Sequence, residues 1–165
     1  MIFDPKIFRA FVSSTLQMSD SMMKDWGYSK PVLYSQEATE LLLGTCAVES
    51  AFGKYRKQIG GPALSIFQIE PDTEKSIWKD MFPSKPGLER LCNELAGVDR
   101  PGDEYNLVNN LVYGILMTRF RYLWVRGSIP QTLDGIAEYW KTGYNTIYGK
   151  GTPEKFKEAY EKYTI

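Results

Sequence analysis

The sequence contains no histidine, and this absence removes several kinds of enzyme active site at once. Catalytic groups of the Ser-His-Asp and Cys-His types need an imidazole as the base that activates the nucleophile. Histidine-ligated zinc centres are excluded for the same reason. Chemistry in this chain therefore depends on carboxylates, lysines, tyrosines and hydroxyl groups, and neither a metal nor an organic cofactor is implied.

Cysteine is scarce and net charge is absent. The two cysteines, Cys46 and Cys92, lie in apolar stretches without C-x-x-C spacing, so we interpret them as small buried hydrophobic residues. Twenty Lys and Arg residues balance twenty Asp and Glu residues, which leaves no global attraction for nucleic acid. We interpret the basic and aromatic stretch 119–126 as a solvated helix face and expect no nucleic-acid partner.

Long apolar runs are also missing. No segment approaches the roughly 18 apolar residues needed to cross a bilayer, so we expect no membrane span. The amino end carries Asp4, Lys6 and Arg9 among its apolar residues, which does not fit a secretory signal. We therefore expect a protein that is made in the cytoplasm without an export signal.

Helical periodicity is present over most of the 165 residues. Apolar residues at steps of three and four, together with capping and breaking residues, predict these helices: 3–24, 36–52, 71–81, 87–96, 105–126, 129–141 and one that starts at Thr152-Pro153. Glycine and proline at 60–62 interrupt the pattern, and the segment 60–70 has room for at most a small β-hairpin. We expect a mainly α fold with six or seven helices in a single domain, 1–165.

Glu49 is the residue that departs from this pattern. Ala38, Leu42, Cys46 and Glu49 recur at steps of four, four and three, so the carboxylate lies along an apolar helix face. An ionised carboxylate there is costly, so either a partner neutralises it or its pKa rises. A carboxyl group that is protonated near neutral pH is suited to general acid catalysis. A buried salt bridge, or a helix end that reaches solvent, would also explain its position.

Four segments between 36 and 147 carry motifs in a fixed order. A helix ends in Glu49-Ser50, and the segment 61–73 follows the pattern Gly-Leu-Met-Gln-Ile-x-Pro-x-Thr at Gln68, Ile69, Pro71 and Thr73, with Ser65 in place of its usual glycine. The later matches are Tyr113-Gly114 and Tyr122-Leu123 in the predicted helix 105–126, whose segment 106–122 resembles the third motif, and Tyr144-Asn145 for the Tyr-Asn of Ala-Tyr-Asn-Ala-Gly. Together they resemble the lytic transglycosylase branch of the lysozyme superfamily, and the segments around the second motif and 148–156 resemble its bacteriophage-encoded members.

The resemblance implies a lysozyme-like α+β fold and an activity on peptidoglycan. Enzymes of this family cleave the β-1,4 bond between N-acetylmuramic acid and N-acetylglucosamine without water, leaving a 1,6-anhydro end, and use one glutamate as acid and base. Glu49 would be that catalytic residue. Ser50 and Gln68 would lie beside it, Tyr144 would hydrogen-bond its carboxylate from the far side of the cleft, and Asn145 would join the substrate-binding residues.

Two alternatives stay open. In the first, the chain is a muramidase that hydrolyses the same bond with a second carboxylate, Glu70 or Asp72, which lie close to Glu49 in sequence. Gln58 stands where phage-type lysozymes place an Asp or Cys, and this departure favours transglycosylation. In the second, it is a non-catalytic component of a phage virion with a lysozyme fold, since replacement of glycine by Ser65 would narrow the cleft. The expected partners are peptidoglycan glycan strands and other virion proteins, and the expected site of action is the bacterial cell wall.

Overall fold

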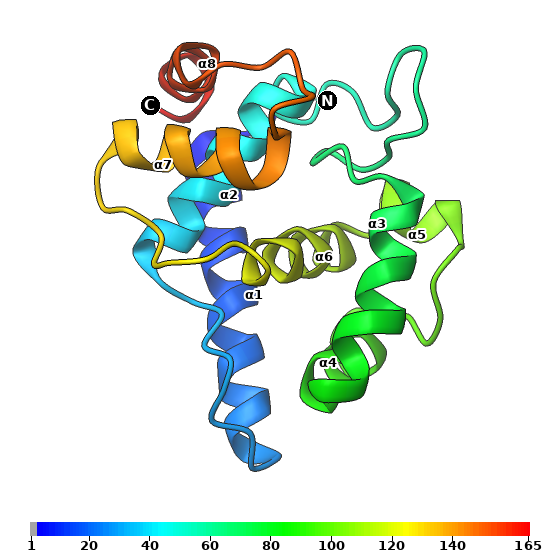
Figure 1. The fold of residues 1–165 in the computed structure, drawn as a ribbon. Helices are drawn as coiled ribbons and strands as arrows, with labels where there is room; N and C mark the ends of the chain where they lie inside the picture. Colours follow the sequence, from blue (N-terminus) through cyan, green and yellow to red (C-terminus); the bar gives the residue numbers. More distant parts are fainter. Residues whose placement is uncertain (1–2) are drawn as a thin grey trace.

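A computed structural model describes residues 3–165 of the chain, and it is mainly helical (Figure 1). The α-helices within these residues are α1 (Pro5–Asp25), α2 (Gln36–Ser50), α3 (Pro71–Ser76), α4 (Pro86–Glu94), α5 (Glu104–Asn109), α6 (Leu111–Leu123), α7 (Leu133–Trp140) and α8 (Pro153–Thr164). Short π-helical turns continue α3 over Ile77–Met81 and α7 over Lys141–Asn145, and a 3-10 turn spans Phe82–Ser84. The expectation of a mainly α fold is confirmed.

Helix starts agree with the capping residues in the sequence. Ser35 accepts a hydrogen bond from the Ala38 amide at 3.0 Å, and Thr152 accepts one from the Lys155 amide at 3.3 Å. Side-chain oxygens at these positions satisfy amides that have no partner within the helix. The second helix ends earlier than predicted, because Ala51 already adopts the left-handed conformation with φ 50°.

The single helix predicted over 105–126 is wrong. The chain leaves the helical conformation at Asn110, where ψ is 97°, and this residue separates α5 from α6. The Asn110 side chain accepts from the Tyr113 amide at 3.0 Å and donates to the Ala96 carbonyl at 2.8 Å. An asparagine that caps a new helix competes with helix continuation. This break raises the number of α-helices in residues 3–165 to eight, against the six or seven expected.

Helix α6 lies at the centre of the molecule, with α1, α2, α7 and α8 on one side and α3, α4 and α5 on the other (Figure 1). Its residues from Tyr113 to Phe120 are all buried, as expected for a helix enclosed by others. Cys46 and Cys92 are free thiols buried in the same core, as predicted.

The connection between α2 and α3 contains the small β element allowed by the sequence. Two isolated antiparallel bridges, Lys57 with Leu64 and Leu64 with Ile69, fold this connection back on itself. The connection extends past the carboxyl end of α2 (Figure 1), so its residues lie close to Glu49 in the last turn of that helix. Over residues 3–165, every helix is too short or too polar to cross a membrane.

Candidate active site

Glu49 lies in the last turn of α2, and the chain reverses immediately after it. Ala51, Phe52 and Gly53 all have positive φ angles, of 50°, 58° and 87°. The Ser50 hydroxyl donates to the Cys46 carbonyl at 2.9 Å and accepts from the Gly53 amide at 2.9 Å. Ser50 is fully buried, and both of these hydrogen bonds to the backbone serve the reversal. The expectation that Ser50 lies beside substrate is therefore corrected: it holds the backbone behind Glu49.

The carboxylate of Glu49 is partly buried and has one direct donor. Its Oε1 accepts a hydrogen bond from Trp140 Nε1 at 3.2 Å. Burial raises the pKa of Glu49 from 4.5 to about 7, while the Trp140 hydrogen bond and the charge of Arg121 oppose that rise. The position at the carboxyl end of a helix also disfavours a negative charge. Both protonation states of Glu49 are therefore populated near neutral pH.

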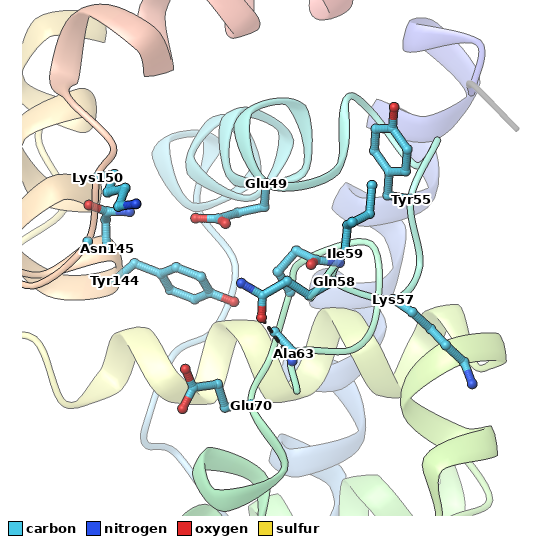
Figure 2. Close-up of a pocket in the computed structure, with 12 residues that line it drawn as sticks. Glu49, Tyr55, Lys57, Gln58, Ile59, Ala63, Glu70, Tyr144, Asn145 and Lys150 are labelled. Carbon is cyan, nitrogen blue, oxygen red and sulfur yellow. Dashed lines mark hydrogen bonds between the residues drawn. The ribbon is translucent and has the colours of Figure 1, made fainter. Parts of the chain in front are cut away.

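A cavity of about 610 Å³ opens in front of this carboxylate. In Figure 2 the Glu49 side chain extends from the end of α2 into the space bordered by Tyr144 and Asn145 on one side and by Tyr55, Gln58 and Ile59 on the other. A second cavity, of about 480 Å³, shares Gln58, Gln68, Glu70, Tyr144, Asn145 and Gly149 with the first and adds Arg121, Thr73 and Tyr148. The two cavities together form a groove, which we call the Glu49 cleft.

Gln68 lines both cavities of the cleft, and its backbone adopts φ 53°. Its Nε2 donates to the Ser65 carbonyl at 2.8 Å, so it also fastens the turn in which it lies. Ser65 has φ 74°, the conformation in which glycine is least strained, and it stands where the motif described in the sequence usually has glycine. Its side chain is buried against Gly114, whose Cβ, if present, would lie 2.9 Å from Ser65 Oγ. Ser65 therefore points into the core and does not narrow the cleft, contrary to expectation.

Tyr144 borders the cleft, but its hydroxyl donates to the Phe67 carbonyl at 2.8 Å. The Tyr144 hydroxyl therefore bonds to the backbone next to Gln68 and not, as expected, to Glu49. The Arg121 guanidinium lies 4.8 Å from the centre of the Tyr144 ring, and its Nη2 donates to the Tyr144 carbonyl at 2.9 Å. Tyr144 thus connects the turn after α7 to the segment that carries Gln68.

Asn145 is brought to the cleft as expected, and it lines both cavities. Its Oδ1 accepts from Lys141 Nζ at 2.8 Å, which fixes the side chain at the start of the loop after α7. Of the four predicted binding residues, Gln68, Tyr144 and Asn145 gather around Glu49, whereas Ser50 lies behind it.

The two candidates for a second carboxylate are separated by the fold. Glu70 lines both cavities and lies near Tyr144 in Figure 2. Asp72 is on the outside of α3, where its side chain is 94% exposed and pairs with Lys75 at 3.8 Å. Gln58 has a carboxamide in place of a carboxylate. Its Oε1 accepts a hydrogen bond from the Ala63 amide at 3.2 Å, and both residues line the cleft. Glu70 is therefore the candidate for a second acidic group.

Glu74 provides a useful contrast, because it is a buried carboxylate without a cavity. It accepts from the Tyr113 hydroxyl at 2.6 Å and from the Gly102 amide at 3.0 Å, and it is only 1% exposed. Burial raises its pKa too. Since its oxygens are already used by donors of the core and it lines neither cleft cavity, Glu74 joins α3 to α6 structurally. What distinguishes Glu49 is a raised pKa together with access to a groove.

Trp140 and Arg121 are the site residues that sequence reasoning missed. Trp140 follows the apolar spacing of its helix and is 1% exposed, so its pattern is that of a core residue. Arg121 belongs to the stretch interpreted as a solvated face, and that interpretation is wrong: Arg121 packs on Tyr144, and Arg119 is only 8% exposed. Trp140 lies four residues before the motif residue Tyr144, but the helix predicted from the sequence ends at residue 141, so helical spacing did not bring the two side chains together.

In comparisons with known proteins, no family model, no curated protein and no solved structure matches this chain. Among the residues that the structure describes, no group of three or more Cys, Asp or Glu side chains could hold a metal ion. The chemistry of this chain is therefore inferred from the geometry of the Glu49 cleft and from the order of its motifs.

Proposed function

We propose that this protein is a lytic transglycosylase of peptidoglycan with a lysozyme-like fold, and that Glu49 is its acid and base. The observation that carries the proposal is a single carboxylate with a pKa of about 7 that faces an open groove. A general acid works best when its pKa lies near the working pH. The order of the four motifs supports the same substrate class.

The reaction uses Glu49 twice. Protonated Glu49 donates its proton to the glycosidic oxygen as the bond from the anomeric carbon to that oxygen breaks. The resulting carboxylate then takes the proton of the 6-hydroxyl of the same muramic acid ring, whose oxygen forms the new bond to the anomeric carbon. The sugar thus closes to a 1,6-anhydro ring, Glu49 is again protonated, and no water is consumed.

The surroundings of Glu49 suit both steps. In the first step the carboxylate becomes charged, and the Trp140 N–H and the Arg121 cation stabilise that charge. Before it, burial keeps the proton on Glu49, because the charged form is poorly solvated. Gln68 and Asn145 both line the cleft, and their amide groups can hydrogen-bond the acetamido groups of the substrate.

Mass spectrometry of the soluble products from purified peptidoglycan tests this proposal. We expect wild-type protein to release fragments one water lighter than hydrolysis products, and Glu49→Gln to release none. Asp72→Asn is the matched control, because it removes an exposed carboxylate outside the cleft and should leave the products unchanged. Full activity of Glu49→Gln would refute the assignment, and no products from folded wild type on several wall types would favour a non-catalytic virion component.

A muramidase is the second candidate, favoured by the presence of Glu70 in the same cleft. Hydrolysis needs a second carboxylate as nucleophile or base. It would leave reducing ends, which reduction with borohydride detects and which 1,6-anhydro ends do not give. Loss of those products in Glu70→Gln would assign hydrolysis, whereas anhydro products that persist in Glu70→Gln support the one-carboxylate reaction.

A further inference from the structure

The loop after α7 is held in an unusual conformation by one lysine. Thr146 has φ 64° and ψ 176°, which is a strained combination for a β-branched residue. Lys141 Nζ donates to Asn145 Oδ1 at 2.8 Å, to the Thr146 carbonyl at 2.8 Å and to the Gly149 carbonyl at 3.0 Å. An ammonium group has three donors, and all three are used within this loop. Lys141 therefore holds the loop in a strained shape.

The loop has no room for a bulkier chain around that ammonium group. A Cβ on Gly149 would lie 2.3 Å from Asn145 Oδ1 and 2.5 Å from the Asn145 carbonyl oxygen. Glycine at 149 thus allows the chain to close tightly on Asn145. Strained backbone persists only where the surroundings impose it, and such positions cluster at binding and catalytic sites.

The tip of this loop exposes apolar surface beside the cleft. Ile147 is 84% exposed, and Tyr148, which lines the cavity of about 480 Å³, is 91% exposed. Across the groove, Ile59 lines the cavity of about 610 Å³ and is also 84% exposed. Figure 2 places Ile59 on the side of the cleft opposite Asn145, from which this loop begins. Exposed apolar groups that border a groove mark a ligand-binding surface.

We propose that Tyr148 and Ile59 make apolar contacts with the bound glycan from the two sides of the cleft. Lys141 is a positioning residue that fixes the loop and so orients Tyr148. Sugar rings have apolar C–H faces, which pack on a flat aromatic ring while their hydroxyl groups stay in water. A loop already fixed by Lys141 loses little conformational entropy when it contacts the sugar. This inference rests on the proposed function only in taking an N-acetylated glycan as the ligand.

Binding of the tetramer of N-acetylglucosamine, measured by isothermal titration calorimetry, tests the proposal without requiring turnover. We expect Tyr148→Ala to raise the Kd about tenfold, which is about 1.4 kcal/mol, and Tyr148→Phe to stay within about twofold. Ile59→Ala should weaken binding in the same direction. Trp124→Ala is the matched control, since Trp124 is a half-exposed aromatic residue at the end of α6 outside both cavities.

Lys141 is tested by its coupling to Tyr148. Lys141→Met should weaken binding at least as much as Tyr148→Ala, because it also releases the Asn145 side chain. Adding Tyr148→Ala to Lys141→Met should weaken binding no further, because the Tyr148 contact is then already lost. On peptidoglycan, each single variant should raise KM with little change in kcat. Unfolding in urea separates these effects from a general loss of stability.

The outcomes separate this inference from the proposed reaction. If Tyr148→Ala weakens binding of the N-acetylglucosamine tetramer while the wild-type protein forms no products from peptidoglycan, the glycan-contacting role of Tyr148 is supported and transglycosylation is refuted. If the wild-type protein forms anhydro products and Tyr148→Ala leaves both Kd and KM unchanged, only the glycan-contacting role of Tyr148 is overturned. Equal losses in Tyr148→Ala and Trp124→Ala would also overturn it, as would additive losses in the double variant with Lys141→Met.

Discussion

Replacement of Glu49 by glutamine should stabilise the protein, and by an amount that depends on pH. The unfolded carboxyl group ionises near 4.5 and the folded one near 7. Between these values the folded state holds a proton that the unfolded state has lost, so the free energy of unfolding falls as pH rises. A pKa difference of about 2.5 corresponds to about 3 kcal/mol, reached above pH 7 and absent below pH 4.5. Glutamine has no such cost and can still accept from Trp140.

Urea unfolding of wild type and Glu49→Gln at several pH values between 4 and 8.5 measures this difference. We expect the two stabilities to differ little at pH 4 and Glu49→Gln to be more stable by about 3 kcal/mol at pH 8. For a chain of this size that corresponds to a rise in Tm of about 6–12 °C. Asp72→Asn should follow the wild-type curve, because its carboxylate is exposed. Parallel curves for wild type and Glu49→Gln would refute a raised pKa at Glu49.

Three other changes test residues that form the Glu49 cleft or support the segments around it. Trp140→Phe removes a hydrogen-bond donor to the charged Glu49 carboxylate, so the pKa of Glu49 should rise further. The decline of kcat/KM above pH 7 should then move to higher pH by about one unit. An unmoved pH profile would contradict this expectation. Ser65→Gly relieves a positive φ of 74°, so urea unfolding should give stability equal to wild type or up to about 1 kcal/mol higher, and a clear loss would count against strain there. Tyr144→Phe leaves the Phe67 carbonyl without its donor and should cost about 1–3 kcal/mol in the same assay, whereas an unchanged midpoint would mean that this hydrogen bond contributes nothing.

The helices were predictable where local signals decide them. Ser35 and Thr152 cap helices at the positions that the sequence indicates, because a cap is an interaction between residues three apart. Asn110 was missed since its apolar neighbours continue the helical spacing on both sides. The Asn110 side chain, which caps α6, also donates to the Ala96 carbonyl, fourteen residues away in the chain. Helical periodicity does not reveal a partner at that distance.

The candidate site divides in the same way. The sequence by itself determined that Glu49 lies on an apolar helix face, because helical spacing is local. Its motifs also indicated Gln68, Tyr144 and Asn145, and the fold brings these three residues to one cleft. Only the tertiary structure decided which groups meet that carboxylate. Trp140 donates to Glu49 across 91 residues of chain. Burial, which sets the pKa of Glu49, comes from the packing of several helices and therefore has no signature in any one segment.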